Sequence, residues 1–260
     1  MLSRSLVKAI QILDCFLERP VMTINELAEI AQMPKTTVFR LAGGLEEAGL
    51  LIKDRKSSHD VTYRMSLKLL EYGKAVSEQL EYSKVARSHM NKLNEEIDEL
   101  VHLTIMEGYK AVYVETVNSS KPVRLVVKVG ARAPLYAGSA PKMLLTGLSD
   151  EEIEEYLDHV EFKQFTPNTL VQKEKIKEEI EKIRERGYSI SYSEHYQATI
   201  GMSYPIYDHD GKMVAAIGVS IPYIDHSKER EEFILSKLEH TVKDIWSELG
   251  YRGVISRNFS

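Results

Sequence analysis

The first 18 residues place an apolar residue at every third or fourth position, with polar residues between them. This spacing is that of one face of an α-helix. It predicts a helix from Ser3 to about Glu18, which ends at Arg19-Pro20 because proline cannot continue a helix. The apolar stripe that we expect to face the core consists of Leu6, Ile10, Leu13 and Leu17.

Two short helices joined by a tight turn are predicted between Thr23 and Gly49. Thr23 and Glu26 form a capping-box pattern, in which the hydroxyl and the carboxylate each bond a free N–H at the helix start. Pro34 suits the first position of the second helix, and Gly49 is placed to end that helix in a left-handed conformation. The apolar positions that pack the two helices together are Leu27, Ile30, Val38, Leu41 and Leu45.

The opposite face of the second helix is polar and cationic. Its N-terminal end carries hydroxyls and long cationic side chains, the residue types that contact base edges and phosphates in a DNA major groove. Two short helices with such a second helix are typical of a helix-turn-helix. An ordinary helical hairpin with a solvated face is the alternative. The residues concerned are Lys35, Thr36, Thr37 and Arg40.

A β-hairpin is predicted after Gly49. Two β-prone runs, 50–52 and 61–65, flank a basic, serine-containing loop at 53–60. After a helix-turn-helix such a hairpin is a wing, whose cations position the protein on the phosphate backbone without reading sequence. A solvated loop is the alternative for each cation. The wing cations are Lys53, Arg55 and Lys56.

The rest of the chain mixes helical and strand patterns. A helix at 66–81 shows no clear packing signals toward either side, and we assign it as a connecting helix. Beyond it, short strands joined by hairpins favour a largely antiparallel six-stranded sheet flanked by helices, an α+β domain, over a parallel nucleotide-binding fold. The predicted strands are 101–106, 111–116, 123–129, 188–193, 201–207 and 212–221, and the predicted helices are 82–98, 139–147, 149–157, 170–186 and 228–249.

Composition narrows the classes of protein. The length of 260 residues suggests about two domains. The single cysteine, Cys15, excludes an intramolecular disulfide and a cysteine-rich zinc site within one chain. No apolar run approaches the ~18 residues of a membrane-spanning helix, and Gln11 and Asp14 interrupt the N-terminal apolar stretch, against a signal peptide. We therefore expect a cytoplasmic protein.

The net charge of −5 is unevenly divided along the chain. Residues 1–65 hold nine Lys or Arg and eight Asp or Glu, a net charge of +1, so residues 66–260 carry −6. This asymmetry is mild. A DNA-binding role rests instead on the local clustering of cations on the second helix and in the hairpin loop.

Motifs for enzymes and metal sites are weak. Ser139 and Lys142 spell Ser-x-x-Lys, the nucleophile motif of β-lactamase-type enzymes, but the partner motifs are absent and the same spacing recurs near the N-terminus. His195 beside Glu194 and the turn at 208–210 could bind a metal, although solvated loops are the preferred interpretation. We expect no catalytic residue, no metal and no cofactor.

A specific resemblance begins at the second helix. The run Pro34-Lys35-Thr36-Thr37-Val38-Phe39-Arg40-Leu41 resembles the recognition-helix signature of the IclR family of bacterial transcriptional regulators, which usually reads Pro-Lys-Ser-Thr-Val-His-Arg-Leu. Leu27–Ala31 resembles that family's Glu-Ile-Ala stretch. Two features depart from the pattern. Phe39 stands where histidine is usual, and Gly43-Gly44 replaces better helix formers, at about 1 kcal/mol for each glycine, which favours a kink or fraying in the last turn.

The resemblance covers essentially the whole chain. Segments 130–142, 194–205 and 214–222 resemble parts of the family's effector domain, which is similar to GAF domains and holds a small, often carboxylate-bearing effector. The N–H groups at the helix start in 130–142, with a serine hydroxyl, are a candidate anion site. Carried over by position, the implied effector-binding residues are Ser139, Ala140, Glu194, Gly201, Gly218 and Ser220.

Two of these pocket positions are glycines where family members often have polar side chains. Gly201 and Gly218 therefore suggest a roomier pocket, for an effector larger or less polar than a two- or three-carbon acid. Glycines that merely serve strand packing are the alternative.

We predict a DNA-binding transcriptional regulator, with repression as the working expectation. Residues 1–65 form a winged helix-turn-helix, 66–81 a linker helix, and 82–260 a GAF-like domain that binds an effector and partner subunits. The expected partners are double-stranded operator DNA, a small carboxylate-bearing effector and further copies of the chain in dimers or tetramers, with no membrane. An enzyme, or a sensor whose N-terminal module binds protein, is the alternative. The residues expected to bind DNA are Thr23, Lys35, Thr36, Thr37, Arg40, Lys53, Arg55 and Lys56.

Overall fold

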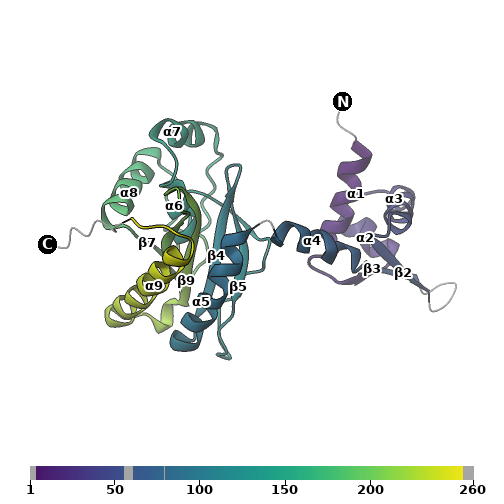
Figure 1. The fold of residues 1–260 in the computed structure, drawn as a ribbon. Helices are drawn as coiled ribbons and strands as arrows, with labels where there is room; N and C mark the ends of the chain where they lie inside the picture. Colours follow the sequence, from purple (N-terminus) through teal and green to yellow (C-terminus); the bar gives the residue numbers. More distant parts are fainter. Residues whose placement is uncertain (1–3, 56–60, 79, 254–260) are drawn as a thin grey trace. The chain divides into compact units, whose positions relative to one another are not determined.

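The structure is a computed structural model that describes residues 4–55, 61–78 and 80–253 (Figure 1). The chain divides into two compact units, with the division between Gln79 and Leu80. Within the described ranges, no helix combines the length and apolarity that crossing a membrane requires.

The N-terminal unit packs helices against a small antiparallel sheet of order β1-β3-β2. Its core is built from all three N-terminal helices and the hairpin, with Ile12, Leu27, Val38 and Tyr63 almost fully buried. The elements are α1 (Arg4–Cys15), β1 (Val21–Met22), α2 (Ile24–Ile30), α3 (Lys35–Glu47), β2 (Leu51–Arg55), β3 (Val61–Met65) and α4 (Lys68–Glu78).

The apolar face of α1 differs from the predicted stripe. Leu6, Ile10 and Leu17 are 47 to 64 % exposed, so the expectation that they face the core is wrong, although Leu13 is buried as predicted. The residues that enter the core lie on the adjacent face of the helix and in the turn after it, and they pack with residues of α2 and α3. They are Ile12, Leu13, Cys15 and Phe16.

The predicted helix signals of α2 and α3 are largely confirmed. In α2 the Thr23 N–H donates to the Glu26 carboxylate at 2.8 Å, and the Glu26 N–H donates to the Thr23 hydroxyl at 3.3 Å, which completes the capping box. Pro34 lies one residue outside α3, at the N-cap instead of the first helical position. The helix continues unbroken through Gly43-Gly44, and the chain leaves it with Gly49 at φ +74°.

The predicted hairpin is present after α3. β2 and β3 pair antiparallel from Leu51 opposite Met65 to Arg55 opposite Val61. A third, two-residue strand, β1, pairs with β3 and was not predicted, because two residues carry no periodicity. The loop predicted at 53–60 begins later than expected, because β2 includes residues 53–55, and its remaining residues 56–60, Lys56 among them, lie outside the described residues.

The C-terminal unit is a six-stranded antiparallel sheet of order β6-β5-β4-β9-β8-β7 (Figure 1). The predicted α+β architecture is confirmed. Its strands are β4 (Leu100–Glu107), β5 (Lys110–Val117), β6 (Arg132–Pro134), β7 (Ser189–Tyr192), β8 (Thr199–Tyr207) and β9 (Met213–Pro222). Its helices are α5 (Glu81–Ile97), α6 (Ser139–Leu145), α7 (Asp150–His159), α8 (Lys173–Arg186), the short 3-10 helix η1 (Tyr223–Asp225) and α9 (Lys228–Glu248).

Two predicted elements need correction. The strand predicted at 123–129 is irregular chain, because the Gly130–Pro134 stretch takes the hydrogen-bonding edge of β5, with Tyr113 N–H donating to the Ala131 carbonyl at 3.0 Å. The sheet therefore has its sixth strand at β6. The helix predicted from Leu170 begins at Lys173, with Gln172 at its N-cap.

The central strands carry different side chains on their two faces. Because neighbouring residues of a strand point to opposite faces, the odd-numbered residues of 101–105 in β4 and 215–221 in β9 and the even-numbered residues of 200–206 in β8 form one large apolar face, which α5 and α9 cover. The other face of these strands carries small or polar residues, and α6 packs on it, with α7 and α8 farther out (Figure 1). The residues of this second face include Leu100 and the small or polar residues His102, Thr104, Gly201, Ser203, Ala216, Gly218 and Ser220.

The continuity of α3 leads to a stability prediction. Gly44 is exposed, and a Cβ added there meets no atom within 4 Å. Gly44→Ala should stabilise α3 by about 1 kcal/mol, because alanine loses less backbone entropy on folding. Hydrogen exchange of the α3 amides should slow about fivefold.

The matched control is Gly49→Ala. Gly49 has φ +74°, so a side chain there is strained and should accelerate exchange. Faster exchange in Gly44→Ala would contradict the prediction.

Candidate DNA-binding surface and ligand pocket

The first turns of α3 present the predicted DNA-contacting side chains to solvent. Lys35, Thr36 and Arg40 are exposed, and Thr37 is partly buried. Val38 and Leu41 point the other way, into the core. Among the described residues, no hydrogen bond or ion pair engages the side chain of Lys35 or Arg40, so both cations are available to a ligand.

The remaining predicted DNA contacts are placed less uniformly. Thr23 lies at the N-cap of α2, where its hydroxyl is held by Glu26 at 2.9 Å. Arg55 is exposed at the end of β2. Lys53 is partly buried on β2, and Lys56 lies outside the described residues.

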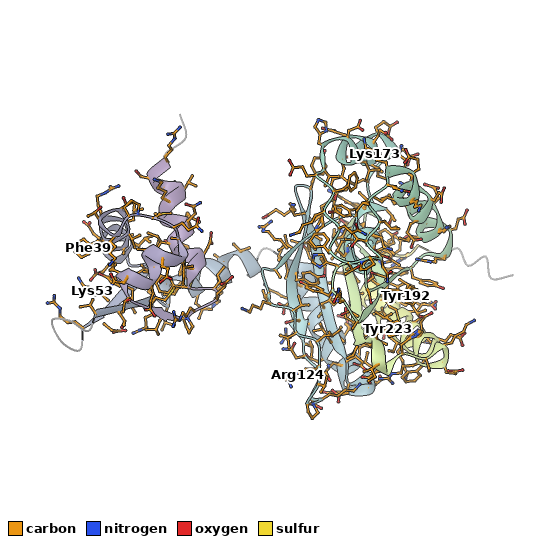
Figure 2. All side chains as sticks on the ribbon, turned by 180° about the vertical axis from the view of Figure 1, so that it is seen from behind. Phe39, Lys53, Arg124, Lys173, Tyr192 and Tyr223 are labelled. Carbon is orange, nitrogen blue, oxygen red and sulfur yellow. The ribbon has the colours of Figure 1, made fainter. Side chains whose placement is uncertain are left out.

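An aromatic contact joins the helix to the wing. Phe39 is 59 % exposed on α3, and the Lys53 ammonium lies 5.9 Å from the centre of its ring and 5.8 Å from that of Tyr63. Figure 2 shows Phe39 and Lys53 on the same side of the N-terminal unit. A cation over an aromatic face is worth about 0.5–1 kcal/mol at an exposed site. Sequence reasoning identified Phe39 as a departure from the family pattern but did not place it in the surface.

A small cavity lies between α6 and the polar face of the sheet. Its volume is about 30 Å³, room for one or two water molecules. Four of the six predicted effector residues line it: Ser139, Glu194, Gly201 and Ser220. Ala140 is fully buried in the adjoining core, and Gly218 lies beneath His102. The other lining residues are His102, Tyr113, Gly138, Ser191, His195, Tyr196 and Thr199.

The two glycines do not enlarge this pocket, so the expectation of a roomier site is wrong. A Cβ on Gly218 would lie 2.4 Å from His102 Cε1, and one on Gly201 would lie 2.6 Å from Ser139 Oγ. Each glycine therefore makes room for a neighbouring side chain. Close packing, the alternative that the sequence left open, accounts for both positions.

His102 is a buried, neutral histidine at the centre of the site. Its Nδ1 lies 3.3 Å from Thr104 Oγ1 and its Nε2 lies 3.2 Å from Ser220 Oγ. Its ring packs edge-on against Tyr113, at 5.1 Å between centroids. Burial lowers the pKa of His102 from 6.5 to about 4. The same burial raises the pKa of Tyr113, so both groups stay uncharged near neutral pH.

Glu194 closes the cavity from the loop 193–198, between β7 and β8. Its Oε1 accepts from the buried Lys142 ammonium at 2.6 Å, and its Oε2 accepts from the Gly138 N–H at 3.2 Å. Its backbone carbonyl accepts from the Thr169 hydroxyl at 2.6 Å. Sequence reasoning included Lys142 in the effector-domain segment 130–142 and in a rejected enzyme motif, but assigned it no part in the pocket.

The next residue of the loop packs among aromatic rings. His195 meets Phe165 at 4.6 Å and Tyr196 at 4.4 Å between ring centroids, both edge-on. Burial lowers the pKa of His195, and among the described residues none bonds its buried Nδ1. Beyond Phe165 lies an open groove of about 550 Å³, lined by Tyr136, Phe162 and other aromatic residues, which the sequence did not indicate.

The lowered pKa of His102 predicts a pH-dependent stability. Between pH 6.5 and 4 the unfolded chain binds a proton at this residue and the folded chain does not, so the free energy of unfolding should fall as the pH drops through this window. The full effect is about 3 kcal/mol. His102→Gln should flatten the profile measured by urea unfolding.

A matched control is His209→Gln, since that side chain is 73 % exposed, and it should leave the profile unchanged. An NMR titration that places the His102 midpoint near 6.5 would contradict the prediction.

Comparison with known proteins agrees with both halves of this structure. The model described as IclR helix-turn-helix domain matches residues 5–55, and the model described as Bacterial transcriptional regulator IclR C-terminal matches residues 74–247. The HTH-type transcriptional regulator KipR of Bacillus subtilis is 33 % identical over 249 residues, which cover 96 % of this chain and 98 % of KipR.

Solved structures show the same fold. The crystal structure of Thermotoga maritima IclR has a TM-score of 0.79 at 30 % identity and covers 95 % of this chain and 99 % of that one. An IclR homologue from Microbacterium hydrocarbonoxydans, complexed with 4-hydroxybenzoate, has a TM-score of 0.78 at 22 % identity, over 94 % of this chain and 98 % of that one. The resemblance found in the second helix is confirmed, and the chain belongs to the IclR family of bacterial transcriptional regulators.

Proposed function

We propose that this IclR-family regulator binds operator DNA through α3 and the wing, and that a small carboxylate-bearing effector in the C-terminal unit controls its operator affinity. The observation that carries the DNA-binding half is the exposed N-terminal end of α3. Its two long cations, Lys35 and Arg40, have no partner among the described residues, while the opposite face of the helix is buried. That arrangement suits a helix whose first residues contact base edges.

The chemistry of the side chains suggests which residues contact bases and which contact phosphates. Arg40 can donate two parallel hydrogen bonds to a guanine, which supports a base-reading role. Lys35, Thr36 and Thr37 lie at the helix start, where hydroxyls and an ammonium suit phosphates and base edges. Lys53, Arg55 and Lys56 belong to the wing and are proposed to contact the phosphate backbone. Thr23 is proposed to act indirectly, by placing the first N–H groups of α2 against the backbone, since its own hydroxyl and N–H are bonded to Glu26.

Effector control is supported by family membership and by the cavity beside α6. The Microbacterium homologue binds 4-hydroxybenzoate, a carboxylate. In this chain the cavity gathers Ser139, Glu194, Gly201 and Ser220 around the uncharged His102. An effector changes operator affinity only if it binds one arrangement of the protein better than another. We propose that the helix 66–81, seen here as α4, transmits this preference between the DNA-binding region 1–65 and the effector region 82–260.

Self-association is supported by exposed apolar side chains in the N-terminal unit. On α1, Val7 and Ile10 are 51 and 47 % exposed, and on α4, Leu70 and Val76 are 69 and 61 % exposed. Exposed apolar residues in such number mark interaction surfaces. A dimer, or a dimer of dimers, would present two α3 helices to half-sites about 34–36 Å apart or a multiple of that distance.

The protein is proposed to act by binding alone, without catalysing a reaction. Its proposed location is the cytoplasm, where its operator DNA lies. Support comes from the relatives, which are named as transcriptional regulators. A ligand recovered unchanged from a saturating titration would agree with a sensor, and turnover of the ligand would contradict it.

Arg40→Ala should weaken binding to an operator selected by the parent protein from random DNA. A lost bidentate base contact costs about 1–3 kcal/mol. Fluorescence anisotropy titration measures the change, and competition with mutated operators should show relaxed specificity at one base pair. The matched control is Arg132→Ala, an exposed arginine of the C-terminal unit paired with Glu107, which should leave operator affinity unchanged. Equal affinities for Arg40→Ala and the parent would exclude the base-reading role.

Phe39 is proposed to contact the methyl group of a thymine, since it is exposed on the DNA-facing side of α3. Replacing each operator thymine in turn by deoxyuridine removes one methyl group. At one position the parent should lose about fourfold in affinity, the value of about 0.8 kcal/mol for one buried methyl-sized group. The Phe39→Ala variant should bind the operator with thymine at that position and the operator with deoxyuridine there equally. The same loss in parent and variant would show that Phe39 does not read that methyl.

A further inference from the structure

We propose that the Glu194 carboxylate occupies the binding position of the effector's own carboxylate. In this view an incoming carboxylate displaces Glu194 from Lys142 and from the Gly138 N–H, and thereby releases the loop 193–198 that closes the cavity. The inference rests on the proposed function, because it assigns the effector's charged group to a place in the proposed pocket. Glu194 is then a built-in competitor of the effector.

The anion-binding position is made by groups outside the loop. Lys142 lies on α6, is 1 % exposed, and also donates to the Ile190 carbonyl at 3.2 Å. A second carboxylate, that of Glu179, lies at 3.4 Å from the same ammonium. Gly138 precedes α6 and offers its N–H from the backbone. Both donors belong to α6 or to the residue before it and not to the loop, so they form a position that another carboxylate can fill.

Glu194 fills this position as a free carboxylate would. Each of its two oxygens has a separate donor: Oε1 takes the Lys142 ammonium at 2.6 Å and Oε2 takes the Gly138 N–H at 3.2 Å. Of the residues that line the cavity in the described structure, Glu194 has the only carboxylate, and none is a lysine or an arginine. Lys142 therefore lies behind Glu194, and a ligand reaches the ammonium only by displacing that side chain.

The cavity must open before it can hold any effector. Ligand pockets typically have volumes of about 300–1,000 Å³, and this one has about 30 Å³. Three residues of the loop 193–198, Glu194, His195 and Tyr196, form part of its wall. The loop is bounded by Ser193 and Ala198, two non-glycine residues with φ near +55°, a conformation that L-residues adopt at a cost. This strain favours the loop as the part that moves.

The chemistry of the position selects the charge of the ligand. A neutral ligand that displaced Glu194 would leave the buried Lys142 ammonium with Glu179 as its nearest carboxylate, and an incompletely paired buried charge is strongly unfavourable. A carboxylate replaces one ion pair by another. The remaining wall offers Ser139, Ser220 and the neutral His102, which suit hydroxyl or carbonyl groups. We infer a carboxylate that bears such groups, as in hydroxy or oxo acids.

The test uses Glu194→Gln in the full chain, because glutamine keeps the shape and loses the charge. The probes are pyruvate, gluconate and 4-hydroxybenzoate, each paired with its amide. By calorimetry, at least one carboxylate should bind the variant tenfold or more tighter than it binds the parent, while the amides gain nothing. The Gly138 signal in a ¹H–¹⁵N spectrum should shift in the variant and return toward its parental position when that carboxylate is added.

Glu181→Gln is the matched control, since it removes one carboxylate from α8 that pairs with Arg184, is exposed, does not contact Lys142 and does not line the cavity. It should leave hydrogen exchange of residues 194–198 as in the parent, whereas Glu194→Gln should accelerate it. As a second variant, Glu194→Ala should be stabilised by acetate and not by acetamide, because acetate fills the vacated position. This measurement remains decisive if the glutamine variant folds poorly.

Two outcomes separate this inference from the proposed function. If some probe alters operator affinity of the parent, but Glu194→Gln binds carboxylates and amides as the parent does, the inference is overturned and the proposed function stands. If Glu194→Gln binds no carboxylate and Glu194→Ala shows no rescue by acetate, the inference is also overturned. If carboxylates bind as expected but leave operator affinity unchanged, the position is real and effector control of DNA binding fails.

Discussion

Along β4, β8 and β9, successive side chains alternate between a face of large apolar residues and a face of small or polar ones, and the C-terminal unit depends on this asymmetry. The apolar face buries residues such as Ile217 and Met202 under α5 and α9. The other face has glycines at positions 201 and 218, where a Cβ would collide with Ser139 or His102. The close approach of α6 and the burial of an uncharged histidine both follow from those missing side chains.

Most of the fold was predictable because its signals are local. Each of these signals depends only on residues close together in the sequence: the capping at Thr23, the left-handed helix end at Gly49 and the alternation of the long strands. The errors arose where the same local pattern was compatible with more than one pairing or packing arrangement. The valine-rich run at 123–129 is as β-prone as any strand, yet the edge of β5 accepts only one partner and Gly130–Pro134 takes it. The apolar stripe of α1 also could not reveal which of two adjacent faces meets the core.

The candidate site was predictable in its location and less so in its chemistry. Family resemblance placed Ser139, Glu194 and Ser220 correctly around one cavity. It could not indicate that Lys142, three residues into α6, reaches Glu194 across 52 positions of sequence. It also could not decide whether each glycine leaves empty space or serves close packing, because a sequence shows which side chain is missing and not which neighbour fills the gap. In the N-terminal unit, the contact between Phe39 on α3 and Lys53 on β2 likewise could not be predicted, because neither element's local sequence pattern indicates that the two elements meet.

The small volume of the cavity beside α6 limits how fast a ligand could enter it. Under the proposed effector control, a pocket with room for one or two water molecules admits the effector only when it opens, so the apparent affinity would be the intrinsic affinity reduced by the open fraction. At high effector concentration the rate of complex formation then reaches a plateau set by loop opening. The protein would average over short pulses of metabolite and report their sustained level.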